Sequence, residues 1–102
     1  MEAACPEVLL SVARAGLEDP TQTVQETAIL ALGPLMNSSL EPEALAVLAP
    51  LVASEDWRDR WRSATTLSLS QSSEAQKLLA ILRQDSNHYV VAAVLEARAR
   101  HQ

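Results

Sequence analysis

The sequence predicts an all-α protein of six helices in three antiparallel pairs, forming a single domain over residues 1–102. Alanine and leucine are abundant, glycine occurs twice and phenylalanine is absent. Alanine and leucine lose little free energy in a helical backbone, whereas the β-branched and aromatic residues that sheets favour are sparse. Two recurring patterns, one built on an aspartate and one on a glutamate, place the six helices.

The first pattern is an aspartate at Asp19, Asp56 and Asp85, at intervals of 37 and 29 residues. The fifth residue after each aspartate is apolar and opens a helix-like run. The second pattern, Pro or Ser followed by Glu, opens PEVLLSVARAGL, PEALAVLAPLVA and SEAQKLLAILRQ. Proline fits a first helical turn because its missing N–H would be unpaired there. Serine caps a helix, and the helix dipole favours glutamate near the N-terminus.

These patterns predict helices at 6–17, 20–36, 42–53, 56–70, 73–83 and 86–101. The second helix has an apolar stripe with the spacing of one helix face. The stripe consists of Val24, Ala28, Ala31, Leu32 and Leu35. Gly33–Pro34 should end or kink this helix. Pro50 should kink the third, because it cannot donate to the Ala46 carbonyl.

Each recurring aspartate lies where the chain turns into the next helix. We expect its carboxylate to cap the free N–H groups of that helix, worth about 0.5–2 kcal/mol. A ladder of metal-binding carboxylates is the alternative. Stacked units lie about 10 Å apart, which is too far for shared ligands and favours capping.

The repeated unit resembles HEAT repeats, in particular the short HEAT-like repeats of phycobilisome lyases. That unit reads Asp-Pro, three residues, Val-Arg, two residues, Ala, two residues, Ala-Leu-Gly. The stretch DPTQTVQETAILALG matches it, with Gln25 in the place of the arginine. The second copy keeps Asp56 and Arg62, and the third keeps Asp85, Val90 and Ala97. The resemblance covers nearly the whole chain and implies a right-handed α-α superhelix, a fold that serves many unrelated roles.

Charge and hydropathy narrow the classes of function. The net charge is −5, from eight basic and thirteen acidic residues, which disfavours a nucleic-acid partner. No apolar run approaches the roughly 18 residues of a membrane span. Glu2 and Glu7 stand where a signal peptide would be basic, and the lone Cys5 fits a reducing compartment. We therefore expect a cytoplasmic protein without a membrane partner.

The sequence contains no catalytic constellation. Cys5, His88 and His101 are the only thiol and imidazole groups, and their spacing matches no zinc or haem motif. Gly16 and Gly33 do not form a phosphate loop. We expect no catalytic residue, metal or cofactor.

The segment EDWRDRWR, residues 55–62, is the most unusual in composition. Its two tryptophans lie four residues apart, on one helix face, among three arginines. Trp61 takes the place of Val24 and Val90 in the repeat, which predicts a core residue. Trp57 at the helix start is either packed locally or part of a binding hot spot. The expected protein-binding surface is Trp57, Arg58, Arg60 and Arg62.

The last helix carries apolar residues on more than one face, at Val90, Val91, Val94 and Leu95. Such a helix needs a second neighbour, since each unit of a solenoid buries its face against the next. Val91 and Leu95 are the expected contacts, either in a homodimer or with a partner that continues the stack. Altogether, we expect a non-catalytic protein-interaction scaffold. The alternative, implied by the resemblance, is a subunit or accessory factor of a bilin lyase or phycobilisome-handling system.

Overall fold

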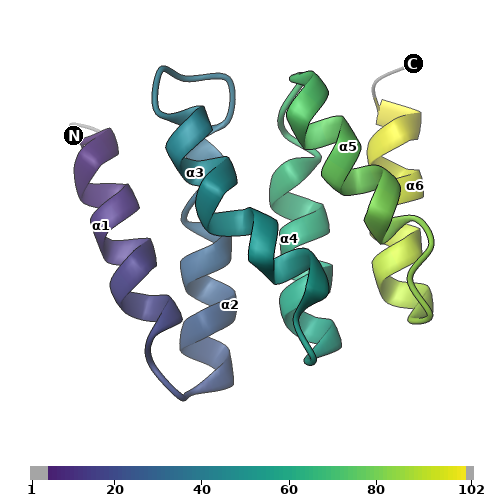
Figure 1. The fold of residues 1–102 in the computed structure, drawn as a ribbon, viewed down its shortest axis with the longest axis horizontal. Helices are drawn as coiled ribbons and strands as arrows, with labels where there is room; N and C mark the ends of the chain where they lie inside the picture. The colour runs from purple at the N-terminus through teal and green to yellow at the C-terminus, as the bar shows by residue number, and fades with distance from the viewer. Residues whose placement is uncertain (1–4, 101–102) are drawn as a thin grey trace.

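The computed structural model describes residues 5–100, without the side chains at positions 97, 98 and 100. The described part contains helices joined by turns and no strands (Figure 1), which confirms the predicted all-α fold of six helices in three antiparallel pairs. The elements are α1 (Pro6–Leu17), α2 (Gln22–Leu30), η1 (Gly33–Leu35), α3 (Glu41–Leu48), η2 (Ala49–Ala53), α4 (Trp57–Leu67), α5 (Ser73–Leu82) and α6 (His88–Arg100). The prediction for the last helix also included His101, which lies outside the described residues.

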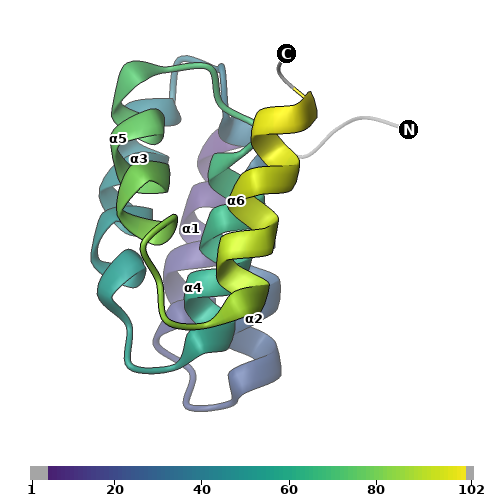
Figure 2. The same cartoon turned by 90° about the vertical axis from the view of Figure 1, so that its right-hand side faces the viewer.

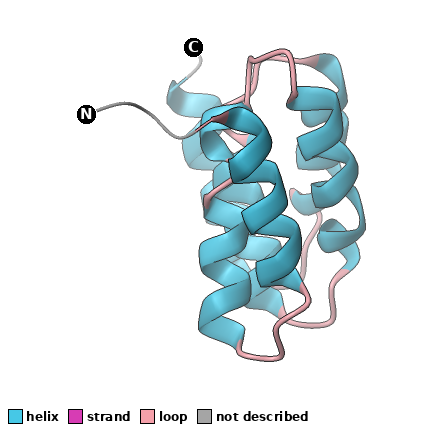
Figure 3. Cartoon of the chain, turned by 90° about the vertical axis from the view of Figure 1, so that its left-hand side faces the viewer, coloured by secondary structure: helices cyan, strands magenta, loops and turns pink. Residues whose placement is uncertain are grey.

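The helices form two layers (Figures 1 and 2). Helices α2, α4 and α6 follow one another in one layer, and α3 and α5 lie in the other. Helix α1 closes the N-terminal end beside α2 (Figure 3). One hydrophobic core runs between the layers, from Leu10 of α1 to Val94 of α6. Its fully buried large side chains include Ile29, Leu48, Leu67 and Leu82.

Prolines divide two of the predicted helices. Helix α2 ends at Leu30, and a 3-10 turn at Gly33–Leu35 follows it. Helix α3 ends at Leu48 and continues as the 3-10 segment Ala49–Ala53, which contains Pro50. Both breaks follow from the missing proline N–H, which cannot bond to the carbonyl four residues earlier.

The aspartates share one local role, but only one of them caps a helix. Asp56 is the N-cap of α4 and accepts the Arg58 N–H at 2.9 Å. Asp19 and Asp85 also accept the N–H two residues ahead, at 2.8 and 2.9 Å, but from residues that precede α2 and α6. The predicted capping is therefore wrong for these two, which instead form Asx turns that lead into the helix.

One serine and one asparagine cap two further helices. Asn87, not Asp85, caps α6, accepting the Tyr89 N–H at 2.8 Å. Ser72 caps α5 through the Ala75 N–H at 3.2 Å, so the predicted cap at Ser73 lies one residue too late. Short side chains one or two residues apart compete for the same N–H groups, and the backbone path decides between them.

The apolar stripe of α2 is buried only in part. Ala28, Leu32 and Leu35 are buried, but Val24 at the start of the stripe is exposed. Val24 lines a groove of 230 Å³ between α1 and α2, so α1 covers this end of the stripe incompletely. The position of Val24 in the repeat therefore does not make it a core residue.

Helices α1 and α2 come closest at Gly16. A Cβ atom added to Gly16 would lie 2.7 Å from the Cβ of Ala28, closer than real Cβ contacts allow. Glycine is required here by space and not by backbone conformation. The contact fixes the distance between α1 and the rest of the stack.

We predict that Gly16→Ala destabilises the protein, although alanine is the better helix former. Overpacking costs about 1–3 kcal/mol, which exceeds the gain of about 1 kcal/mol in helix propensity. The free energy of unfolding, measured by urea denaturation, should fall by about 1–2 kcal/mol. Adding Ala28→Gly should relieve the contact, so the double variant should show no further loss from Gly16→Ala. A Gly16→Ala variant more stable than wild type would contradict the contact.

Candidate functional site: the α4 surface

The two tryptophans of α4 stack with a tyrosine of α6. The ring centroids of Trp57 and Trp61 lie 5.7 Å apart, and those of Trp57 and Tyr89 5.5 Å apart. Trp61 and Tyr89 are 6.2 Å apart, in a tilted arrangement. We call these three rings the aromatic surface. His88 extends it, with its ring 4.3 Å from Tyr89.

The aromatic surface lies at an intermediate depth. Trp57 and Trp61 are both half-buried, and Tyr89 is exposed. The prediction that Trp61 is a core residue is therefore wrong, although its ring does pack against the edge of the core. Stacking with Trp57 and Tyr89 holds Trp61 at this depth, because the offset rings cover part of one another's apolar surface without entering the core. The sequence pattern did not predict Tyr89 as part of this surface, since nothing local brings it beside Trp57 and Trp61, 32 and 28 positions earlier.

A groove of 340 Å³ adjoins the aromatic surface between α4 and α6. Trp61 and Tyr89 form its aromatic rim, and the small residues Thr65, Ala92 and Ala93 also line it. Glu96 contributes a carboxylate. Rings beside an accessible groove with few polar groups are typical of a surface that binds another molecule.

Arg60 is occupied within the fold. Its guanidinium binds the Asp85 carboxylate with two nitrogens, at 2.7 and 3.3 Å, and donates to the Ser54 carbonyl at 2.6 Å. The Arg60 side chain is 16% exposed and that of Asp85 9%. The ion pair joins α4 to the turn before α6. Arg60 therefore belongs to the framework, by which we mean the contacts that hold α4 in place beneath the aromatic surface.

Arg62 is also engaged, on the opposite side of α4. It donates to Glu26 of α2 at 2.9 Å, and its guanidinium carbon lies 3.9 Å from the centre of the Trp61 ring. Arg58 pairs only with its neighbour Asp56, at 2.8 Å, and its side chain is 45% exposed. Of the three arginines predicted as contacts, Arg58 is the most exposed, Arg62 is 30% exposed and Arg60 is mostly buried.

Further polar contacts hold α4 to α2. Gln22 donates to the buried Asp59 carboxylate at 2.8 Å, and Ser54 donates to the same carboxylate at 3.3 Å. Deeper in the layer, the Thr66 hydroxyl donates to the Ile29 carbonyl at 3.1 Å. The contacts of Gln22 and Ile29 cross between repeats and fix α4 on its α2 side, whereas the Ser54 contact is local to the start of α4.

The pKa of Asp85 lies below its ordinary value. Burial raises the pKa, but the hydrogen bond from Arg60, the Asn87 N–H and the charge of Arg60 together lower it by more. The carboxylate is therefore ionised at neutral pH, and the ion pair with Arg60 is intact.

The apolar residues of α6 divide between the core and the surface. Val90 and Val94 are buried, because they face α4 and α5. Val91 is half-buried, and Leu95 is 46% exposed. The unpartnered apolar face predicted for the last helix is thus smaller than four residues and centres on Val91 and Leu95.

A buried carboxylate at the other end of the layers joins two loops. Glu41 accepts the Ser70 hydroxyl at 2.6 Å and the Asn37 N–H at 2.7 Å. Asn37, with φ of 65°, also donates to the Leu69 carbonyl at 2.8 Å. Burial raises the pKa of Glu41, but hydrogen bonds from Ser70, Asn37 and Ser72 outweigh it and leave the pKa lowered. These hydrogen bonds join the two loops. They also engage the Glu41 carboxylate, so it is not free to act as a catalytic acid or base.

Three further observations on the described residues concern metal binding, the single cysteine and membrane spans. No group of three His, Cys, Asp or Glu side chains within residues 5–100 could hold a metal ion. Cys5 is exposed and donates to the carboxylate of Glu7. None of the described helices is both long and apolar enough to cross a membrane.

We predict that the arginines of α4 differ sharply in their effect on stability. Arg60→Met should lower the free energy of unfolding by about 2–4 kcal/mol, since it leaves the mostly buried Asp85 unpaired. Arg58→Met, the matched control in the same helix, removes an exposed pair and should cost less than about 1 kcal/mol. Denaturant unfolding at neutral pH measures both variants. Equal small losses would show that Arg60 is not part of the framework.

A second prediction concerns the pH dependence of stability. Because folding lowers the pKa of Glu41, its contribution is present above the ordinary value of 4.5 and is lost as the pH falls through the lowered value. Glu41→Gln should therefore be less stable than wild type at neutral pH, and the difference should shrink in acid. Glu43→Gln, exposed in the same first turn, is the control and should lack this trend. Thermal unfolding across the acid range measures it, and parallel curves for Glu41→Gln and wild type would refute it.

Comparison with known proteins yields one result. The sequence model of HEAT repeats matches residues 7–99. No curated protein and no solved structure matches the chain. The match spans all six helices, and the structure shows the stacked antiparallel pairs that such repeats form. The chain therefore belongs to the HEAT-repeat family.

Proposed function

We propose that the protein is a non-catalytic interaction scaffold that binds a protein partner at the aromatic surface. HEAT repeats commonly serve as protein-interaction scaffolds, and the observation that carries this proposal is the stack of Trp57, Trp61 and Tyr89 beside the α4–α6 groove. Tryptophan and tyrosine are enriched among residues that dominate binding energy. Rings at this depth bring a large contact area at a low entropic cost, because their neighbours already hold them.

Charge supports the same surface. Arg58 at one edge keeps an exposed guanidinium, while Glu96 lines the groove at the other. Arg60 and Arg62 hold Trp61 and α4 in place from beneath. In this proposal Trp57 and Arg58 contact the partner, and Arg60 and Arg62 position the rings.

The proposal treats residues 1–102 as one domain. A single core includes residues of all six described helices, and no described segment has a separate core. We further propose the cytoplasm as the site of action, supported by the single cysteine of the sequence.

Val91 and Leu95 form a second proposed contact surface, at the open side of α6. Leu95 is exposed, and no described helix covers that side. A homodimer or a partner that continues the stack would bury them.

The alternative function is an accessory role in a bilin lyase or phycobilisome-handling system. Its support is the resemblance of the repeat unit to that of the lyases, given by DPTQTVQETAILALG. Titration of the protein with a linear tetrapyrrole tests it, and a shifted visible absorption band would favour this alternative over the scaffold.

We predict that Trp57→Ala and Tyr89→Ala reduce partner capture, because each removes a ring of the aromatic surface. Leu69→Ala, an exposed apolar residue just past the end of α4, is the control and should leave capture unchanged. Affinity capture with quantitative mass spectrometry measures the partner, and thermal unfolding measures stability. Trp61→Ala should cost the most stability of the three ring substitutions, about 2–4 kcal/mol, because its ring packs on the core. Capture that survives both Trp57→Ala and Tyr89→Ala would place the binding site elsewhere.

A further inference from the structure

Helix α6 is held to the stack by few buried side chains, and these lie in its first half. Its main neighbours are α4 and, less closely, α5. Val90 and Val94 are the buried residues among the described side chains of this helix. Leu95, Glu96 and Ala99, which follow, are exposed. By comparison, α4 lies between α2 and α6 and buries five residues. Helix α6 is therefore the less firmly anchored of the two.

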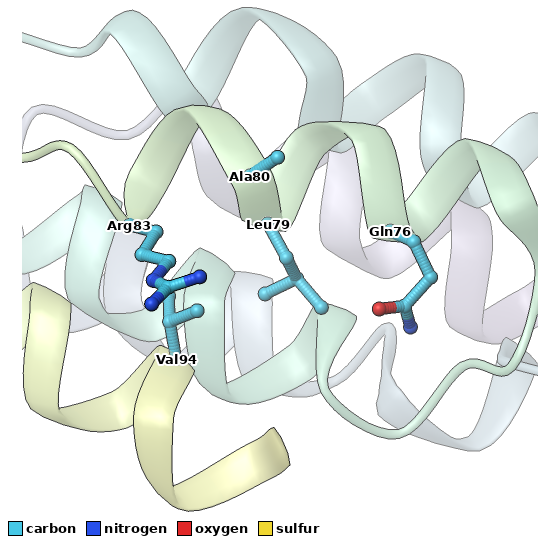
Figure 4. Close-up of a pocket in the computed structure, with 5 residues that line it drawn as sticks. All are labelled: Gln76, Leu79, Ala80, Arg83 and Val94. Carbon is cyan, nitrogen blue, oxygen red and sulfur yellow. The ribbon is translucent and has the colours of Figure 1, made fainter.

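Grooves adjoin α6 on both of its packed sides. The groove between α5 and α6 has a volume of 290 Å³. Figure 4 shows Gln76 and Arg83 on either side of Leu79 in this groove, with Val94 of α6 below Arg83. The groove of 340 Å³ beside the aromatic surface lies between α4 and α6. Because open space adjoins both contacts, less apolar area holds α6 in place than would hold a helix that is packed along its whole flank.

An ion pair secures the turn that leads into α6. Arg60 of α4 binds the Asp85 carboxylate with two nitrogens, at 2.7 and 3.3 Å, and both side chains are mostly buried. We call α6 docked when it packs on α4 in this way. Without the charge of Asp85, that of Arg60 would be buried and unpaired in the docked state, and undocking would return it to water. The ion pair therefore favours the docked position.

The aromatic surface is shared between the same two helices. Trp57 and Trp61 belong to α4, and Tyr89 belongs to α6. The Tyr89 ring centroid lies 5.5 Å from that of Trp57 and 6.2 Å from that of Trp61. The adjoining groove also has a wall from each helix, with Thr65 on α4 and Ala92 on α6. Neither helix carries the complete surface, so the surface is complete only while α6 is docked.

We propose that α6 undocks from α4 as a unit in a minor population of molecules, and that its docking, favoured by the Arg60–Asp85 ion pair, assembles the aromatic surface. The other helices stay folded in the undocked state, because the stability of a repeat protein is a sum over neighbouring units. A partner that contacts rings of both helices binds the docked state and shifts the population toward it. This inference rests on the proposed function, since it concerns the regulation of the same surface.

Hydrogen exchange of the full chain, followed residue by residue by NMR, tests the undocking. In wild type, the amides of residues 91–96 in α6 should exchange as one group, and faster than those of residues 26–30 in α2. Asp85→Asn should speed the exchange of residues 91–96 by about tenfold or more, because it leaves Arg60 without its counter-charge in the docked state. Exchange in α2, on the far side of α4, should stay within about twofold of wild type.

Two further variants make this test specific. Val94→Ala removes buried methyl groups from α6 without touching the ion pair, and it should also speed exchange selectively in α6. Glu41→Gln is the matched control, since it too replaces a mostly buried carboxylate by an amide, but at the other end of the layers. It should leave exchange in α6 within about twofold of wild type. Equal protection of α2 and α6, in wild type and in Asp85→Asn, would show that α6 opens only on global unfolding and would overturn the proposal.

Near-UV circular dichroism tests the link between docking and the aromatic surface. Trp57, Trp61 and Tyr89 are the only tryptophan and tyrosine residues of the sequence, which has no phenylalanine, so the near-UV signal reports on this surface. In Asp85→Asn the near-UV signal should be lost at a lower urea concentration than the far-UV signal of the helices. In Glu41→Gln the two transitions should coincide, as expected for a single cooperative step.

The outcomes separate this inference from the proposed function. Coincident near-UV and far-UV transitions in Asp85→Asn, together with faster exchange in α6, would show that undocking leaves the rings in place, and would overturn the assembly of the surface by α6. Neither measurement involves a partner. Partner capture that survives both Trp57→Ala and Tyr89→Ala therefore refutes the proposed function by itself, whatever the exchange and dichroism results are.

Discussion

The first two turns of α4 hold the layer of α2, α4 and α6 together. On the α2 side, Asp59 accepts a hydrogen bond from Gln22, and Arg62 donates one to Glu26. On the α6 side, Arg60 donates to the carboxylate of Asp85. Asp59, Arg60 and Asp85 are largely withdrawn from water, so each of them must keep its partner to avoid the cost of an unpaired buried charge. That requirement fixes the position of one helix relative to the next. It also explains why a segment so rich in charge lies at the centre of the fold.

The aromatic surface depends on this framework. Arg62 covers one side of Trp61, and Trp57 and Tyr89 stack beside it, so contacts within the chain hold the three rings in place. Small residues along the neighbouring groove, such as Ala92 and Ala93, leave the rings accessible. Arg60 and Arg62 thus act on the aromatic surface indirectly, by fixing the positions of α4 and the Trp61 ring.

The loops at the other end of the layers are also held together by a few buried polar groups. Glu41 is almost fully buried, yet it remains ionised because hydroxyl and amide donors surround it. Asn37 adopts a left-handed conformation, which asparagine tolerates better than most residues, and thereby reaches both the Leu69 carbonyl and the Gln71 N–H. Two connections of different repeats are therefore fixed to each other at a place with little apolar surface.

The sequence by itself determined the local elements. Prolines, serines and glutamates mark helix starts within a residue or two, and Pro34 and Pro50 mark the breaks, because these effects act over a single turn of backbone. The tertiary structure alone decided which side chains meet across repeats. The pairing of Arg60 with Asp85, the stacking of Tyr89 on Trp57 and the exposure of Val24 depend on how far and at what angle neighbouring helices pack. The repeat pattern assigns equivalent positions to Val24, Trp61 and Val90, but their burial differs because each of their helices has different neighbours.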